Sequence, residues 1–143
     1  MNLFNVRVYA LLIYNGKILL SDETYSGHHF TKFPGGGLLF GEGTTDCLMR
    51  EFREEFNWDI EVTSHFYTTD FFVQSVFNPQ HQILSIYYNI VNPNENQLQF
   101  ENLMSIEKHA SLRWKKLIEL SDTDVTFPID KKVVNLLLEK KHP

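Results

Sequence analysis

A cluster of charged residues in the first half of the chain has a spacing that suits metal-dependent chemistry on phosphate groups. Its members are Glu42, Arg50, Glu51, Glu54 and Glu55, and a glycine run at residues 35–37 precedes them. Carboxylate oxygens are the ligands that hard divalent cations such as Mg²⁺ prefer. Glycine lets the backbone approach a ligand closely because it has no side chain. The segment is therefore suited to holding a cation against phosphate oxygens.

The same segment has the pattern of an amphipathic helix that would display its carboxylates together. Glu51, Glu54 and Glu55 occupy positions i, i+3 and i+4, which share one face of a helix. Apolar side chains at i, i+4 and i+8 form a neighbouring stripe, namely Leu48, Phe52 and Phe56. We expect the helix to begin near Thr44 or Thr45, both good N-cap residues. The apolar stripe would anchor the helix while the glutamates face a ligand.

Residues 36–58 resemble the signature of the Nudix hydrolase family, G-x5-E-x7-R-E-U-x-E-E-x-G-U, in which U is a bulky apolar residue. The polar or glycine positions that match are Gly36, Glu42, Arg50, Glu51, Glu54 and Glu55. A helix rich in Glu and Arg is by itself usually a solvated surface, but at this spacing the residues favour a metal-dependent active site. Asn57 replaces a signature glycine, and asparagine also tolerates the left-handed conformation that ends many helices. Trp58 replaces an aliphatic residue, and Leu39 stands where many members carry a further glutamate.

The resemblance implies a divalent metal site and a role for each matching residue. The metal would be Mg²⁺, with Mn²⁺ as the alternative. Its implied ligands are Glu51, Glu54, Glu55 and the carbonyl group of Gly35. Glu42 and Arg50 would orient these ligands, since an arginine can hold carboxylates in place through several hydrogen bonds.

The general base differs among members of the family, and the sequence leaves two locations open. In some members the base is a signature glutamate, which corresponds to Glu54 here, and in others it comes from a later loop. Glu107, seven residues before Trp114, is the preferred candidate outside the signature, ahead of Glu101 and Glu95. An ordinary solvated acid is the competing interpretation for each of these loop residues.

Substrate contacts are predicted from the glycine run and from the segment before it. Gly36 and Gly37 would bring backbone close to the substrate, and His29, with His28 beside it, could contact phosphate or base. A ring that stacks on a base could come from several aromatic residues, although alternating strands should bury most of them. These candidates are Phe71, Phe72, Phe77, Tyr87 and Tyr88.

The elements around the cluster indicate an α/β protein. Residues 4–14 and 17–20 should pair as a hairpin, because Asn15-Gly16 between them is a strong turn signal. Residues 24–32 have the composition of a surface loop. The remaining expected elements are strands within 60–78, 82–92 and 112–115 and a helix that begins at Pro128. We therefore expect one domain over residues 1–143, an α/β/α sandwich with a central mixed β-sheet, as the resemblance also implies.

Composition limits the kinds of partner and the cellular compartment that we expect for this protein. The formal charge of −5 argues against broad nucleic-acid binding, which needs a basic surface. Cys47 is the only cysteine, so no intrachain disulfide can form. No signal peptide or apolar run long enough to cross a membrane is present, so the cytoplasm is the expected compartment. The sequence leaves open whether the protein is a homodimer.

The predicted function is metal-dependent hydrolysis of the diphosphate bond in a nucleoside diphosphate linked to another moiety. The signature does not choose between substrates. ADP-ribose or an NDP-sugar is slightly preferred over a nucleoside triphosphate, because nothing in the sequence marks recognition of an oxidised base. The alternative is a Nudix-like nucleotide-sensing or interaction domain without turnover. Such a domain would be expected to have lost metal carboxylates, and all of them are present here.

Overall fold

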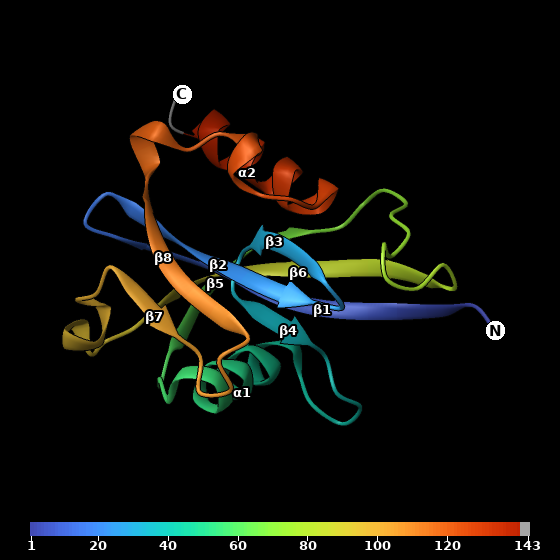
Figure 1. The fold of residues 1–143 in the computed structure, drawn as a ribbon, viewed down its shortest axis with the longest axis horizontal. Coiled ribbons are helices and arrows are strands. Elements are labelled where there is room, and N and C mark those ends of the chain that lie inside the picture. The colour runs from blue at the N-terminus through green and yellow to red at the C-terminus, as the bar shows by residue number, and fades with distance from the viewer. Residues whose placement is uncertain (141–143) are drawn as a thin grey trace.

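A mixed β-sheet runs through the centre of the molecule and carries one helix on each face (Figure 1). The computed structural model describes residues 1–140, so residues 141–143 of the predicted domain lie outside the described part. The α/β/α sandwich expected from the sequence is confirmed. In chain order the elements are β1 (Leu3–Tyr14), β2 (Lys17–Tyr25), β3 (His28–Lys32), β4 (Gly35–Gly37), α1 (Thr44–Phe56), β5 (Glu61–Thr68), β6 (His81–Val91), η1 (Glu95–Leu98), β7 (Asn102–Met104), β8 (Ala110–Lys116), η2 (Leu117–Glu119), η3 (Asp122–Asp124) and α2 (Pro128–Lys140).

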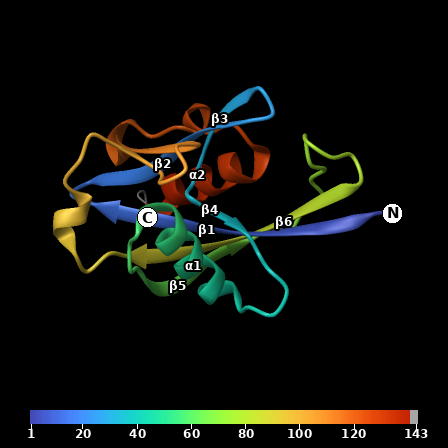
Figure 2. The same cartoon turned by 60° about the horizontal axis from the view of Figure 1, so that its bottom comes forward.

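Strand β1 is the centre of the sheet and contacts three other strands. The strand order is β5-β6-β1-β2-β8-β7, with β3 paired to β2 and β4 paired to β1. Within residues 1–140 only β1 and β6 pair in parallel, and Figure 2 shows the two strands side by side. The short strand β4 runs antiparallel to β1 and places Gly37 opposite Arg7, Gly36 opposite Val8 and Gly35 opposite Tyr9. The glycine run is therefore built into the sheet.

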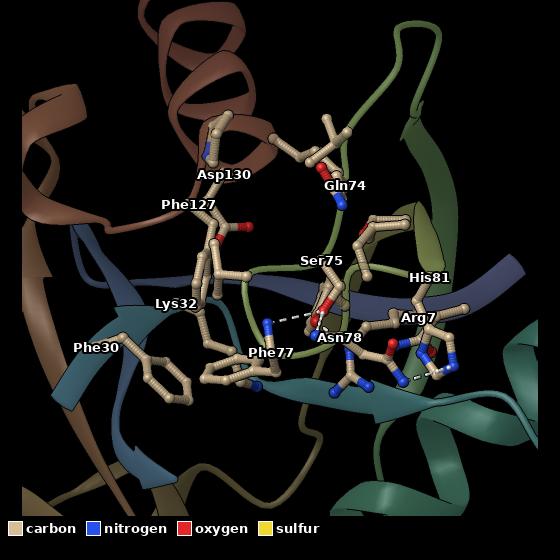
Figure 3. A pocket seen from close by; sticks show the side chains of 18 of the residues that line it. Arg7, Phe30, Lys32, Gln74, Ser75, Phe77, Asn78, His81, Phe127 and Asp130 are labelled. Atoms are coloured by element: carbon tan, nitrogen blue, oxygen red, sulfur yellow. Dashed lines mark hydrogen bonds between the residues drawn. The ribbon is translucent and has the colours of Figure 1, made fainter. Parts of the chain in front are cut away.

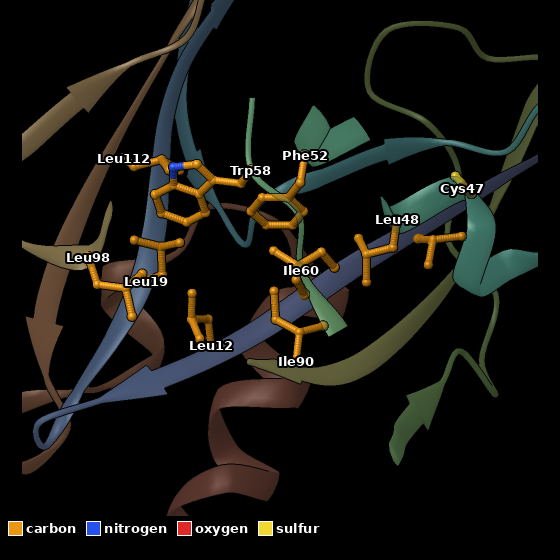
Figure 4. Packing of buried hydrophobic residues seen from close by; sticks show 12 residues of the cluster. Leu12, Leu19, Cys47, Leu48, Phe52, Trp58, Ile60, Ile90, Leu98 and Leu112 are labelled. Atoms are coloured by element: carbon orange, nitrogen blue, oxygen red, sulfur yellow. The ribbon is translucent and has the colours of Figure 1, made fainter. Parts of the chain in front are cut away.

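The alternation of side chains along β1 divides the core into two clusters. Even-numbered residues face α1 and odd-numbered residues face α2, because successive side chains of a strand point to opposite faces. Val8, Ala10 and Leu12 belong to the cluster with α1, whereas Tyr9 and Leu11 belong to the cluster with α2. Figure 4 shows the first cluster, in which Leu48 and Phe52 of α1 pack beside Trp58 and Leu12. Both clusters hold β1 rigidly between the helices.

Both helices begin close to the predicted positions, with one correction. The N-cap of α1 is Gly43, so the prediction that Thr44 or Thr45 caps the helix is wrong. The hydroxyl of Thr44 instead forms a hydrogen bond with the hydroxyl of Tyr88 on β6. Asn57 ends α1 in the left-handed conformation, as predicted. Neither this helix nor any other within residues 1–140 is long and apolar enough to span a membrane.

The segment at 24–32 is not a surface loop, and this prediction is wrong. Strand β2 continues to Tyr25, and β3 pairs with it through a tight turn at Ser26-Gly27. Both turn residues have positive φ values, of 50° and 77°, which is the backbone typical of a two-residue hairpin. The strand character was hidden because both strands are largely polar and solvent-exposed here. The strand expected within 60–78 is β5, which ends at Thr68, and residues 69–80 form a loop.

Candidate active site

Arg50 joins three of the predicted glutamates in one hydrogen-bonded network. Its Nε and Nη2 atoms donate to the two carboxylate oxygens of Glu42 at 2.9 and 2.7 Å. Its Nη1 atom donates to Glu51 at 3.2 Å and to Glu54 at 3.1 Å. The Nη2 atom also donates to the carbonyl oxygen of Gly37 at 3.1 Å, which ties the helix to β4. These hydrogen bonds from Arg50 lower the pKa of Glu42 to about 2, so Glu42 is ionised at neutral pH.

Glu51 lies against the backbone of β4 at a position that requires glycine. A β-carbon at Gly36 would clash with the carboxylate of Glu51. Gly35, by contrast, faces the other side of the strand, and a side chain there would meet the backbone of Val8 and Tyr9. Its φ of 151° also disfavours other residues. The glycine run therefore allows helix and strand to approach closely, with a carboxylate between them.

Glu55 is held from a different part of the chain. Its carboxylate contacts the Nε2 atom of His109 at 3.0 Å, and its main-chain carbonyl accepts a hydrogen bond from Ile106 at 2.8 Å. The Glu55 side chain is only 20% exposed. Burial and the nearby charge of Glu51 raise the pKa of Glu55. The ionised form of Glu55 is therefore disfavoured unless a positive partner lies beside it.

The oxygen donors on this face fit a hard divalent cation. Within the described residues, no group of three or more acidic, histidine or cysteine side chains already surrounds a common point. The reason is that Arg50 contacts Glu51 and Glu54, while His109 contacts Glu55. A bound cation would replace the Nη1 contacts of Arg50, whereas the contacts with Glu42 could remain. The carbonyl oxygen of Gly35, a predicted ligand, lies 3.5 Å from the ammonium group of Lys32.

A pocket of about 520 Å³ opens on the opposite side of β4 from the glutamates. Figure 3 shows side chains that line it, and the lining residues come from β1, β2, β3, the loop at 69–80, β6 and the start of α2 with the residue before it. Arg7 lies at the boundary, because it pairs with Gly37 in the sheet and is close enough to Glu51 for the two charges to interact. Aromatic rings form another wall, where Phe77 contacts Phe30 and Phe127 with ring centroids 5.8 and 6.3 Å apart.

Two buried charges, Lys32 and Asp130, line the same pocket. The ammonium group of Lys32 lies 2.8 Å from Glu23 and over the ring of Tyr9, at 4.9 Å from its centroid. Asp130 accepts a hydrogen bond from the hydroxyl group of Tyr87. Burial raises the pKa of Asp130 to about 6, although the hydrogen bond from Tyr87 and the charge of Lys32 act in the opposite direction. The pocket therefore has both cationic and acidic recognition groups.

Replacing Asp130 by asparagine should change how stability depends on pH. The pKa of Asp130 rises from 3.8 to about 6 on folding, so between these values the folded state binds more protons than the unfolded state. Wild-type stability consequently falls as pH rises through this window, and asparagine cannot ionise. The free energy of unfolding of Asp130→Asn relative to wild type should grow by up to about 3 kcal/mol between pH 4 and pH 7. Urea unfolding across this range measures it, and a difference independent of pH would contradict the prediction.

The remaining predicted site residues lie outside the hydrogen-bonded network of Arg50. His29 is in β3, not in a loop, and its ring bonds to the hydroxyl of Thr24 at 2.9 Å. It lines a shallower depression beside His109, outside the large pocket. Glu107 is exposed in the turn that contacts α1 at Glu55, and its role as a base stays a prediction. Of the aromatic candidates, Phe77 and Tyr87 line the large pocket, whereas Phe72 lines a separate one.

Several pocket residues were absent from the sequence-based prediction. Arg7 is in β1 and Lys32 is in β3. The order of polar and apolar residues in these strands does not indicate that the two charged side chains line one pocket. Asp130 did leave a signal, because it shares the apolar face of α2 with Val134 and Leu137 at i+4 and i+7. An acid on a buried helix face indicates a specific partner or ligand.

Comparison with known proteins agrees with this geometry. The NUDIX domain model matches residues 3–137. No curated protein sequence matches the chain. Among solved structures, the E. coli ORF135 protein has a TM-score of 0.73 at 20% identity, covering 99% of this chain and 93% of that one. The MutT protein of Methanosarcina mazei Go1 has a TM-score of 0.73 at 14% identity, with 99% and 98% covered. The mismatch repair protein MutT of methicillin-resistant Staphylococcus aureus 252 has a TM-score of 0.67 at 23% identity, with 98% and 99% covered. At these identities the structural matches establish the fold.

Proposed function

The chain belongs to the NUDIX domain family of phosphoanhydride hydrolases, and from this premise we propose that it cleaves a nucleoside diphosphate linked to another group. The linked group is a sugar, as in ADP-ribose or an NDP-sugar, or a further phosphate, as in a nucleoside triphosphate. The observation that carries the proposal is the position of β4. This bare glycine strand has the glutamates of α1 on one side and the cationic, aromatic pocket on the other.

The α1 side supplies the hydrolytic groups. Glu51, Glu54 and Glu55 would hold Mg²⁺ or Mn²⁺, for which their oxygen donors are suited. The metal, when bound, neutralises phosphate charge and activates water for attack on phosphorus. Arg50 fixes Glu42 and binds the carbonyl of Gly37, so it keeps helix and strand in register around the phosphate position. Glu54 is the most exposed of the three proposed ligands, and its one ion pair, with Arg50, would have to give way for it to reach substrate or water.

The pocket side supplies groups for the nucleoside half of the substrate. Arg7 lies beside Gly37 and has a guanidinium group directed to the boundary between pocket and glutamates, where it can pair with a phosphate. The rings of Phe77, Phe30 and Phe127 provide apolar surfaces on which a base can stack. The volume of about 520 Å³ is within the range of small-ligand pockets. A diphosphate that crosses β4 would connect the two sides.

Phosphate release from a panel of substrates tests the proposal and identifies the linked group. The panel contains ADP-ribose, NDP-sugars, dinucleoside polyphosphates and the nucleoside triphosphates, each with and without Mg²⁺ and with a coupled phosphatase. Turnover that depends on metal and is restricted to one class supports the proposal. If folded protein binds these compounds but turns over none of them, the nucleotide-sensing alternative replaces hydrolysis.

Replacing Phe77 by alanine should weaken substrate binding more than it slows the chemical step. Loss of a stacked base costs about 1–3 kcal/mol, so KM should rise by about 5- to 150-fold. The value of kcat should stay within about threefold, because Phe77 is across β4 from the carboxylates. Phe72→Ala is the matched control, since it removes an exposed ring of the same loop that is outside this pocket. An unchanged KM in Phe77→Ala would show that the nucleotide base of the substrate does not stack on Phe77.

A further inference from the structure

The turn between β7 and β8 reaches across to the last predicted metal ligand of α1. The amide of Ile106 in this turn donates to the main-chain carbonyl of Glu55 at 2.8 Å, and His109 contacts the carboxylate of the same residue at 3.0 Å. The two contacts therefore fix both the main chain and the side-chain carboxylate of Glu55. We infer that His109 is a positioning residue that fixes the carboxylate of Glu55 for metal binding, an inference that rests on the proposed function.

The hydrogen bonds around His109 favour a proton on Nε2, because this nitrogen faces the carboxylate of Glu55, which accepts hydrogen bonds when it is ionised. The amide of Ala110 donates to the hydroxyl oxygen of Ser105 at 3.2 Å. The hydroxyl group of Ser105 can then donate to Nδ1 of His109, which lies 3.4 Å away. This assignment, made from the hydrogen-bond network, leaves Nε2 protonated and directed at Glu55. In this assignment each group donates to the next, from Ala110 through Ser105 and His109 to Glu55.

Glu55 needs a hydrogen-bond donor other than Arg50, because Arg50 orients the other carboxylates of the site. Arg50 contacts Glu42, Glu51 and Glu54, and these contacts orient the other carboxylates of the site. Glu55 points toward the β7–β8 turn, where His109 is its side-chain partner. A hydrogen bond to a ligating carboxylate restricts its orientation, and loss of such a bond typically weakens metal binding by about 10- to 100-fold. His109 thus does for Glu55 what Arg50 does for the other glutamates.

Binding of Mn²⁺ to His109 variants, followed by electron paramagnetic resonance, tests this role without any substrate. His109→Leu removes the donor, and its Kd for Mn²⁺ should rise by about 10- to 100-fold. His109→Gln keeps an N–H donor at the end of the side chain, and its Kd should return to within about threefold of wild type. His65→Leu is the matched control, because His65 is an exposed histidine of β5. Melting temperatures of all variants separate positioning from loss of fold.

The tautomer of His109 provides a second readout in the metal-free protein. Long-range ¹H–¹⁵N correlation spectra should show the proton on Nε2 in wild type, and Ser105→Ala should reduce that preference. A proton on Nδ1 in wild type would overturn the inference. Equal Mn²⁺ affinities for wild type and a folded His109→Leu variant would also overturn it, while leaving the proposed function intact. A wild-type protein that binds no Mn²⁺ would contradict the proposed function itself.

Discussion

Replacing Glu54 by glutamine should lower kcat by at least about a hundredfold while leaving the fold unchanged. Glu54 is a predicted metal ligand and the signature residue that serves as base in some members of the family, and general-base catalysis alone contributes about 10²- to 10⁴-fold. Its side chain is 60% exposed, and its contact in the structure is the ion pair with Arg50. An exposed pair of this kind contributes at most about 1 kcal/mol to stability.

Steady-state rates with the substrate identified by the panel, together with the melting temperature, measure the Glu54 prediction. Glu61→Gln is the matched control, since it removes one exposed glutamate charge at the start of β5. If Glu54→Gln retained wild-type kcat with the same metal requirement, Glu54 would be neither ligand nor base. Glu107→Gln would then be the next variant to measure.

Replacing Gly36 by alanine should reduce activity through displacement of Glu51. The added methyl group would occupy the space of the Glu51 carboxylate, which must turn away from β4. Gly36 is not among the residues with positive φ, so alanine can adopt its backbone conformation and the sheet should persist. Because a predicted ligand loses its position, we expect kcat/KM to fall by about 10- to 100-fold.

A compensating change separates this steric explanation from general damage. Glu51→Asp shortens the displaced side chain by one methylene group, which creates room for the methyl group that Gly36→Ala introduces. Each single variant should be impaired, and the double variant should be more active than the product of the two defects predicts. Purely additive losses would show that Gly36 acts independently of Glu51.

The sequence was sufficient to predict the parts of the molecule that depend on local spacing. The i, i+3, i+4 positions of Glu51, Glu54 and Glu55 place them on one face of α1. In the apolar stripe that anchors this helix, Leu48 and Phe52 are buried and Phe56 is partly buried. Asn57 adopts the left-handed conformation that its replacement of glycine predicted. Both features follow from helix periodicity and from the conformational preference of a single residue.

The features that the sequence did not predict depend on residues that are distant along the chain. His109 and Glu55 are separated by 54 residues, and no periodic pattern links them. Lys32 is buried because β3 pairs with β2 and places it beside Glu23, whereas the polar composition of residues 24–32 favoured a loop. The pocket has the same origin, since its walls come from strands, a loop and a helix that only the fold brings together.

If the proposed function holds, the position of β4 would let substrate choice and bond cleavage be altered separately by protein engineering. The rings proposed to stack on the base belong to β3, to the loop at 69–80 and to the residue before α2, and none of them belongs to α1. A combinatorial library confined to Phe30, Phe77 and Phe127 would thus sample new substrates without altering a single carboxylate. Variants with a different substrate preference could then be selected while the carboxylates of α1 stay unchanged.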